Sequence, residues 1–300
     1  LYNYMSQILV ELIKMANLII TLTKAAACGD RVASVLSVKS TQKDGEKAPA
    51  LDAPHGSVVF DGVSMSYAGA GTESVSGVSF TAAPGSTVGV IGGTGSGKST
   101  LVNLIPRFYD VTGGRVLVDG MDVRDIRKEE LRRRIGVVPQ KAMLFKGTIR
   151  SNLLWGNADA TEADLNDALK VAQALDVVSS KSKGLDEPVE QGGRNFSGGQ
   201  RQRLTIARAL VRKPEILILD DSASALDYAT DANLRRAIRQ MENPPTTFIV
   251  SQRAASVRFA DQIIVLDDGH VAGMGTHDEL LASCPVYQEI YASQFKKEGK

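Results

Sequence analysis

The sequence predicts an α/β fold in which buried strands alternate with helices around a glycine-rich loop. Continuous apolar runs predict buried strands at 86–92 (STVGVIG), 215–221 (EILILDD) and 246–252 (TTFIVSQ). The glycine-rich loop follows the first strand, and the run at 100–105 (TLVNLI) predicts an amphipathic helix after it. A chance glycine-rich turn is the less favoured explanation of the loop, because a strand precedes it and a helix follows.

The loop itself, GGTGSGKS at 92–99, has the spacing G-x-x-x-x-G-K-[ST]. Its glycines allow positive φ and a close approach to a ligand, so that successive N–H groups can surround a polyphosphate. The lysine of this pattern reaches the β- and γ-phosphates, and the serine hydroxyl binds Mg²⁺. We therefore expect a nucleotide site formed by Gly92, Gly93, Thr94, Gly95, Ser96, Gly97, Lys98, Ser99 and Thr100.

Composition excludes several other classes of protein. The formal net charge is +1, so no global field favours nucleic acid or acidic membranes. Cys28 and Cys284 lie far apart without metal-ligand spacing, which fits a reducing compartment, and three histidines are too few for a histidine-rich metal site. The chain begins at Leu1 without a signal-peptide pattern, and we expect it to be a fragment of a longer protein.

The first 36 residues are rich in helix formers and contain no proline. Glu11, Lys14 and Asn17 interrupt the apolar run at 8–23, so no span of about 18 apolar residues is unbroken. The residues alone leave two interpretations: an amphipathic helix packed on a globular domain, or the cytoplasmic end of a bundled membrane helix. The polar stretch at 39–56, which contains proline and glycine, predicts a linker.

The remaining elements follow in order. Thr161 is expected to cap a helix with Asp164 at its third position, and Ser197 is a candidate cap for the helix within 194–210. A hairpin is expected to turn at Asp268-Gly269. The other expectations are strands at 57–67, 75–85 and 115–120, a basic helix leading into a strand within 122–140, helices within 148–180, the hairpin at 261–275, and helices at 277–283 and 286–296.

Four further stretches resemble the motifs of ABC ATPases. FSGGQRQR (196–203) resembles the signature sequence, VVPQ (137–140) the Q-loop, ILILDD (216–221) the Walker B strand, and SALD (224–227) the D-loop. They occur in the family's order. A helix N-terminus at the signature is a second phosphate-binding device, which indicates a dimer that buries ATP between two chains.

The resemblance implies a P-loop NTPase core (ABC ATPase) with an antiparallel β subdomain and an α-helical subdomain, preceded by the end of a transmembrane helix. Residues 1–38 would be the C-terminal end of the last transmembrane helix, 39–56 the linker, and 57–296 the nucleotide-binding domain, with the helical subdomain at about 141–213. The segments RFYDVTGGRVLVDG and LFKGTIRSNLLWG look like the exporter branch. The implied location is the cytoplasmic face of the cell membrane, and no nucleic acid partner is expected.

The resemblance also assigns roles to single residues, with ATP and Mg²⁺ as cofactors. Tyr67 would stack on adenine, the alternative being packing at a strand edge. Ser99, Gln140 and Asp220 would hold Mg²⁺, and the catalytic group would be Asp221, Gln252 and Gln140. Ser197, Gly198, Gly199 and Gln200 would contact the partner's nucleotide, with Asp227 in the D-loop.

Two positions depart from the family pattern. Asp221 stands where the family has a catalytic glutamate, and Gln252 stands where it has the switch histidine. Asp221 is one methylene shorter, and Gln252 cannot carry the charge of an imidazolium. Because the signature is intact, the chain resembles the degenerate half of a heterodimeric bacterial multidrug exporter. Its partner would be a second, non-identical nucleotide-binding domain. The isolated chain is then expected to be a weak ATPase.

Alternatives from other classes remain at this point. One is a regulatory module that binds ATP without hydrolysis and gates a partner subunit. Another is a soluble ABC protein of DNA repair or translation. It would need a coiled-coil insertion or a second cassette, which this sequence does not contain, and the LFKGTI stretch and residues 1–36 also argue against it. The segment 144–156 is expected to face the transmembrane domains, the alternative being that Phe145 and Trp155 are core residues.

Overall fold

The computed structural model describes residues 1–38, 40, 42–48 and 55–295. These form two compact units, Leu1–Lys43 and Asp44–Lys300. Parts of the expected linker (39, 41 and 49–54) and the last residue of the expected final helix (296) lie outside the described residues.

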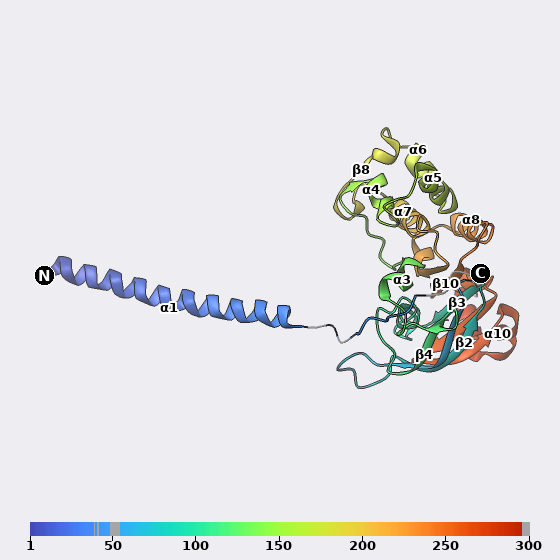
Figure 1. Cartoon of the computed structure of the whole chain (residues 1–300), viewed down its shortest axis with the longest axis horizontal. Helices are drawn as coiled ribbons and strands as arrows, with labels where there is room; N and C mark the ends of the chain where they lie inside the picture. The colour runs from blue at the N-terminus through green and yellow to red at the C-terminus, as the bar shows by residue number, and fades with distance from the viewer. Residues whose placement is uncertain (39, 41, 49–54, 296–300) are drawn as a thin grey trace. The chain divides into compact units, whose positions relative to one another are not determined.

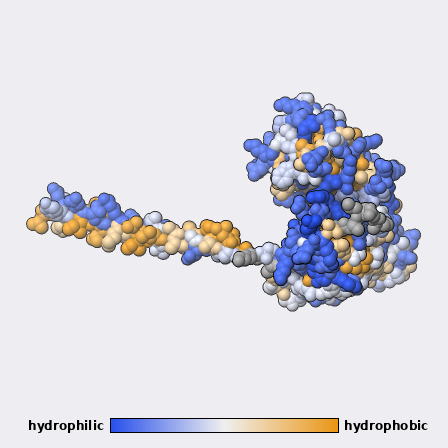
Figure 2. All heavy atoms as spheres, in the orientation of Figure 1, coloured by the Kyte–Doolittle hydropathy of each residue, from blue (hydrophilic) through white to orange (hydrophobic). Residues whose placement is uncertain are grey.

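The first unit contains one helix, α1 (Tyr2–Ser37), with none of its side chains buried. Hydrophobic residues cover much of its surface in Figure 2. Glu11 and Lys14 interrupt the apolar run but lie within the continuous helix, where they pair with each other at 2.8 Å. Within the described residues, α1 is the helix long and apolar enough, by length and composition, to cross a membrane.

The second unit is built on a central sheet. Its strands are β3 (Thr87–Gly92), β6 (Ile135–Val138), β9 (Ile216–Asp220), β10 (Thr246–Ser251), β11 (Gln262–Asp267) and β12 (His270–Gly275). Their order is β12-β11-β3-β10-β9-β6, with β12 antiparallel to β11 and all other pairs parallel. Parallel strands are covered on both faces, which explains their continuous apolar sequences.

A smaller antiparallel sheet packs beside the central one. It has the order β2-β1-β4-β5, and its strands are β1 (Val58–Met65), β2 (Val75–Ala82), β4 (Gly113–Val118) and β5 (Met121–Asp122). Phe60 and Phe80 stack at 4.5 Å across β1 and β2, and both belong to the hydrophobic cluster that also contains Phe248 of β10. Burial of these rings joins the two sheets.

Helices complete the unit, and Figure 1 shows α4–α7 gathered together with β8 in one part of it. The α-helices are α2 (Lys98–Asn103), α3 (Lys128–Arg133), α4 (Ile149–Leu154), α5 (Glu162–Val171), α6 (Leu175–Ser179), α7 (Gly198–Leu210), α8 (Tyr228–Arg239), α9 (Ala254–Val257), α10 (His277–Ser283) and α11 (Pro285–Phe295). Short elements among them are β7 (Gly147–Thr148), β8 (Pro188–Val189) and 3-10 turns at Gly184–Asp186, Gln191–Gly193 and Ser222–Ala225.

Several expectations are confirmed at the level of single residues. Thr161 and Asp164 form the predicted capping box at the start of α5. The hairpin turns at Asp268 and Gly269, whose φ angles of 43° and 80° are those of a type I′ turn. The helical stretch 148–180 is divided into α4, α5 and α6. Helix α8 was not predicted from the sequence.

One correction concerns the expected linker. Residues 44–48 belong to the second unit and bind the segment before α3. Lys47 exchanges two backbone hydrogen bonds of 3.0 Å with Asp125 and Arg127. The Asp44 carboxylate accepts a 2.8 Å bond from the Lys128 N–H at the start of α3, which lowers the pKa of Asp44. Gly45 allows this close approach, because a Cβ atom there would lie 2.3 Å from the Asp125 backbone, so residues 44–48 form a specific attachment rather than a free connection.

Candidate nucleotide-binding site

Three predicted functional segments meet at the carboxyl ends of adjacent parallel strands. The glycine-rich loop begins where β3 ends at Gly92, Asp221 follows β9, and Gln252 follows β10. The strand register aligns these ends, since Ser251 pairs with Ile91 and Val250 with Asp220. Ligands of open α/β sheets bind at this edge.

The loop has an open, glycine-dependent backbone. Gly95 and Gly97 adopt positive φ angles of 82° and 92°. A Cβ atom at Gly97 would lie 2.3 Å from the backbone oxygen of Ser74, so only glycine fits there. Gly93 and Gly95, in contrast, face open space, and the loop from 93 to 95 is exposed. A ligand therefore has access to the loop backbone.

Lys98 points back into this loop. Its side chain is buried, and its Nζ donates to the backbone oxygens of Gly92 (3.0 Å) and Gly93. Burial lowers the pKa of the ammonium, while the carboxylates of Asp220 and Asp221 oppose that shift. The ammonium is thus held at the loop by two neutral backbone oxygens. A charged phosphate oxygen would be a stronger acceptor and could replace them.

Ser99 and Asp220 lie side by side next to Lys98. The Ser99 hydroxyl donates a 3.0 Å hydrogen bond to Oδ1 of Asp220. Burial raises the pKa of the Asp220 carboxyl, and the nearby Asp221 adds to this shift. A hydroxyl and a carboxylate at the end of a phosphate-binding loop are oxygen donors of the kind that Mg²⁺ prefers, so these residues fit a Mg²⁺-nucleotide.

Gln140 lies at the site, but its side chain is next to Asp221 rather than next to Asp220, with which it was expected to hold Mg²⁺. Its Nε2 lies 3.4 Å from Oδ2 of Asp221, whereas Asp220 is bonded to Ser99. Asp221 itself has a positive φ of 47°, a left-handed conformation that aspartate tolerates better than longer residues. The Asp221 N–H donates to the Val250 oxygen at 2.9 Å, which ties this residue to the end of β10.

Gln252 is exposed and directly follows β10, the neighbour of strand β9, at whose end Asp220 and Asp221 lie. Its backbone oxygen accepts a 2.8 Å hydrogen bond from the side chain of Gln294 in α11. Gln294 was not among the residues predicted from the sequence, because nothing in the sequence shows a contact 42 residues away.

Tyr67 lies next to the helix that follows the loop. Its hydroxyl is 3.0 Å from the Thr100 hydroxyl, and its ring meets Tyr109 edge-on at 5.0 Å. The ring is half-buried. It therefore stands where a base could stack when the phosphates occupy the loop.

The signature residues lie at the N-terminus of α7, away from the loop. Ser197 caps the helix and forms a capping box with Gln200, and Ser197 and Gly198 are exposed. Asp227 caps α8 through the Thr230 N–H, and this bond lowers its pKa. Among residues 1–38, 40, 42–48 and 55–295, no hydrogen bond or ion pair joins the signature to the loop.

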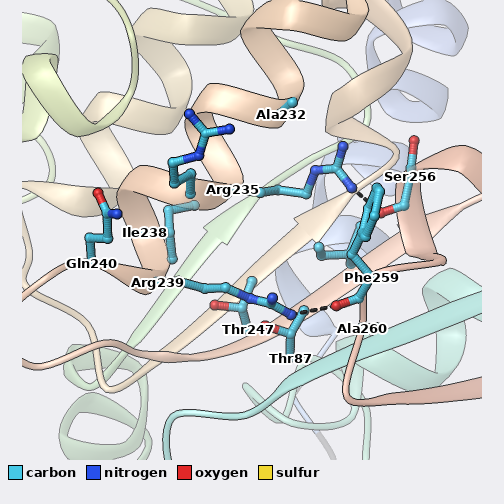
Figure 3. A pocket seen from close by; sticks show the side chains of 12 residues that line it. Thr87, Ala232, Arg235, Ile238, Arg239, Gln240, Thr247, Ser256, Phe259 and Ala260 are labelled. Atoms are coloured by element: carbon cyan, nitrogen blue, oxygen red, sulfur yellow. Dashed lines mark hydrogen bonds between the residues drawn. The ribbon is translucent and has the colours of Figure 1, made fainter. Parts of the chain in front are cut away.

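A separate pocket of about 410 Å³ lies elsewhere and contains none of the predicted site residues. Figure 3 shows its lining from α8 and from the amino ends of β3 and β10, including Arg235, Arg239 and Thr87. Its guanidinium groups are largely engaged, since Arg235 pairs with Asp231 at 2.9 Å and Arg239 donates to the Phe259 oxygen. The pocket is at the edge opposite the loop, and we assign it no part in nucleotide binding.

A second cluster, His55, Asp119 and Glu215, has its potential metal-ligand atoms within 4.8 Å of one another. The guanidinium of Arg134 occupies this position, since it donates to both carboxylates and lies 3.1 Å from Nδ1 of His55. The cluster is therefore an ion-pair network that fixes the segment before β1.

These features define a P-loop nucleotide-binding domain. The chain belongs to the ABC transporter family, whose model matches residues 75–224. As a member of this family it is an ATP-binding domain with Mg²⁺ as the usual cofactor, and ATPase activity is the activity of the family.

Individual relatives support the assignment. An uncharacterized ABC transporter ATP-binding protein of Mycobacterium tuberculosis (strain ATCC 25618 / H37Rv) is 45% identical over 297 residues, covering 97% of this chain and 50% of the relative. YgaD of Bacillus subtilis (strain 168), provisionally named a multidrug export ATP-binding/permease protein, is 38% identical over 281 residues, covering 94% and 48%. A bacterial Atm1-family ABC exporter solved with ATP bound has a TM-score of 0.83 at 35% identity, covering 92% of this chain and 48% of that structure. The chain thus spans about half the length of the curated relatives it matches.

Proposed function

We propose that this chain is the ATP-binding domain of a membrane exporter and that its nucleotide lies between its own P-loop and the signature of a second domain. The main support is the placement of two exposed phosphate-binding devices on one chain, the loop at 93–95 and the α7 N-terminus at Ser197 and Gly198. Because no contact joins them among the described residues, two chains arranged head to tail would complete two sites.

At the chain's own site, each residue has a distinct task. The Lys98 ammonium leaves its backbone acceptors for the β- and γ-phosphates, and the Tyr67 ring stacks on the base. Ser99 and Asp220 hold the Mg²⁺ ion, with Gln140 as a further ligand or water contact. The ion neutralises phosphate charge, and the chain's residues orient the nucleotide.

Hydrolysis at this site is impaired in our proposal. Asp221 ends one methylene short of a glutamate and contacts Gln140 at 3.4 Å. Gln252, at the end of β10, offers an uncharged amide where the family has histidine. Both departures lie at the same sheet edge, so water positioning and charge stabilisation are weakened together.

The partner's site would remain active. Ser197, Gly198, Gly199 and Gln200 match the signature and form an intact helix start with a capping box. We propose that these groups complete the active site of a non-identical nucleotide-binding domain, so that the transporter is a heterodimer. Asp227 at the start of α8 would contact the same interface.

The domain boundaries follow from this proposal. Residues 1–38 would be the end of the last transmembrane helix, which agrees with the length and composition of α1. Residues 39–56 would form the linker, with 44–48 attached to the domain, and 57–296 the nucleotide-binding domain with its helical subdomain at about 141–213. The domain would lie at the cytoplasmic face of the cell membrane, and the exported substrate is not specified by this chain.

The surface that faces the transmembrane domains would include Phe145 and Trp155. Their rings stack at 4.5 Å yet are 44% and 68% exposed, so the alternative that they are core residues is wrong. The Arg208 guanidinium lies 5.5 Å from the Phe145 ring and is itself largely buried, which holds the pair in place. Exposed, stacked aromatic residues are typical of a contact surface.

A regulatory module that binds ATP without turnover is the second candidate. The same two departures, Asp221 and Gln252, favour it. It differs from the first candidate in one outcome only: the mixed dimer would not hydrolyse ATP at either face.

Calorimetry with ATP and Mg²⁺ tests the site assignment. Lys98→Ala should weaken binding by about 100-fold, since a charge-assisted contact to phosphate is lost from a mostly buried position. Arg133→Ala is the matched control, because Arg133 is 62% exposed and forms only long ion pairs with Glu129 and Glu130. Unchanged ATP affinity in Lys98→Ala would reject the site.

A further inference from the structure

Gln294, near the end of α11, makes two hydrogen bonds to the backbone that follows β10. Its Nε2 donates to the Gln252 oxygen at 2.8 Å, and its Oε1 accepts from the Ala254 N–H at 2.9 Å. The two bonds flank Arg253, so one side-chain amide holds both sides of a three-residue turn. The amide side chain offers a donor and an acceptor on two separate atoms, which this arrangement uses together.

The turn has few other supports. Arg253 stands at the N-cap position of α9 but makes no side-chain capping bond. Its N–H donates to the Ser251 hydroxyl at 2.9 Å, which secures the near side of the turn. The buried Ala254 N–H would be without a partner if Gln294 were absent, and an unsatisfied buried N–H is costly.

The helix that carries Gln294 is firmly anchored. Tyr287 of α11 is fully buried, and its hydroxyl lies 2.8 Å from Nδ1 of His277 at the start of α10. Gln288 donates to the Leu281 oxygen at 2.7 Å, which joins α11 to α10 a second time. Tyr291 and Phe295, on either side of Gln294 in the sequence, also pack against the hydrophobic core, so α11 holds the exposed Gln294 side chain beside the turn.

We infer that Gln294 is a positioning residue that sets the backbone of Gln252, and through it the Gln252 side chain, at the γ-phosphate side of the site. This inference rests on the proposed function, in which Gln252 stands at the switch position and contributes to the residual hydrolysis of the impaired site. Gln252 is exposed and follows directly after the last strand residue, so its direction depends on the turn that Gln294 holds. The C-terminal helix thereby acts on the hydrolytic geometry without touching the nucleotide.

Amide hydrogen exchange tests the contact itself. In Gln294→Leu, which keeps the size of the side chain, the Ala254 N–H should exchange at least about tenfold faster than in the parent chain. Gln288→Leu is the matched control, because it removes a glutamine-to-backbone bond from the same helix at a distance from the turn. Equal exchange at Ala254 in Gln294→Leu and the parent would overturn the inference whatever Gln252 does.

Single-turnover hydrolysis of ATP, with protein in excess, tests the consequence. The purified chain is used at a concentration at which two copies pair head to tail, so that each P-loop meets a signature and the slow residual hydrolysis of this site is what is measured. Gln294→Leu should slow hydrolysis by about tenfold with unchanged ATP affinity, whereas Gln288→Leu should not. Gln294→Glu, which keeps the acceptor but loses the donor to Gln252, should be slow as well. In the double variant with Gln252→Ala the two effects should not add, because both act through one side chain.

The outcomes separate this inference from the proposed function. If Gln252→Ala slows hydrolysis while Gln294→Leu does not, the role of Gln252 stands and the positioning role of Gln294 is wrong. If Gln252→Ala leaves the rate unchanged, the proposed role of Gln252 is wrong, and the positioning role falls with it even where exchange at Ala254 is faster. Full additivity in the double variant would also overturn the inference.

Discussion

The Ser99 hydroxyl donates to Asp220 at 3.0 Å, which joins the first residues of α2 to the end of β9. Burial raises the pKa of the Asp220 carboxyl, so the folded domain binds a proton at this position more readily than the unfolded chain does. Mg²⁺ requires the ionised form. Burial of Asp220 therefore lowers the Mg²⁺ affinity of the site, because protons compete with the ion for the carboxyl. Two measurable effects follow.

Magnesium binding in the presence of ATP should weaken as the pH is lowered below neutral, and at a higher pH than for an ordinary aspartate, because protons compete for a carboxyl whose pKa is raised. In Asp220→Asn the competition by this carboxyl should disappear, and Mg²⁺ affinity should be at least about tenfold lower throughout. Titration of Mg²⁺ by calorimetry at several pH values measures both. A parent affinity that is constant over these pH values would contradict the prediction.

The stability of the metal-free domain should change in the opposite direction. A carboxyl whose folded pKa lies above its unfolded pKa stabilises the fold only while it is protonated, and that contribution is lost as the pH rises through the folded pKa. Asp220→Asn should therefore raise the Tm at neutral pH without nucleotide. Asp110→Asn, which removes the partner of Arg107 at 2.6 Å, is the control and should lower the Tm.

The ring of Tyr67, rather than its hydroxyl, should determine ATP affinity. Tyr67→Phe loses only the 3.0 Å contact with Thr100 and should bind ATP within about threefold of the parent. Tyr67→Ala loses the stacking surface and should bind at least about tenfold more weakly. If the two variants bound ATP equally, the stacking role would be wrong and packing at the strand edge would be favoured.

Truncation should distinguish the attached part of the linker from the first helix. Deletion of 1–38 should improve solubility and leave ATP affinity unchanged. Deletion of 1–48 should also remove the Asp44 contact with the α3 N-terminus and the Lys47 backbone bonds, and should lower the Tm by several degrees. Equal Tm values for the two truncations would show that the 44–48 attachment contributes no stability.

The surface around Phe145 and Trp155 should lie against cytoplasmic loops of the full transporter. A cysteine at position 147 is unsuitable, because Gly147 has a φ of 154° and a Cβ there would lie 2.6 Å from the Ser151 hydroxyl. Met143 is 48% exposed and serves instead. Met143→Cys should crosslink to cysteines in those loops, whereas Asp159→Cys, in an exposed turn, is the control. Transport without any such crosslink would contradict the prediction.

Much of the central sheet and the loop could be predicted because their signals are local. The strand before Gly92, the cap at Thr161 and the turn at Asp268 each depend on a few adjacent residues. Helix α8 was missed because its sequence, YATDANLRRAIR, is mostly polar, with Leu234 and Ile238 as its large buried apolar residues. Its apolar face is narrow, formed by these two residues one turn apart, and the packing of this face against the hydrophobic core stabilises the helix.

The contacts of the site depend on residues far apart in the chain. Ser99 meets Asp220, and Gln140 meets Asp221, only because the order of strands brings their ends together. The motif spacing therefore identified which residues to expect, while their pairing required the fold. Gln294 belongs to no motif, so nothing local in the sequence could indicate its contact with Gln252.

The division of hydrolysis between two faces is the central claim, and steady-state ATPase of the reconstituted heterodimer tests it most directly. A Ser197 substitution such as Ser197→Ala should reduce turnover by about tenfold or more, since it removes a contact to the partner's nucleotide. Asp221→Asn should change turnover by less than about threefold, because that carboxylate is already displaced from the catalytic position. No turnover in the unmodified heterodimer would favour the regulatory module instead. If Asp221→Asn abolishes activity while Ser197→Ala is silent, the active face lies on this chain's own P-loop and the account is wrong.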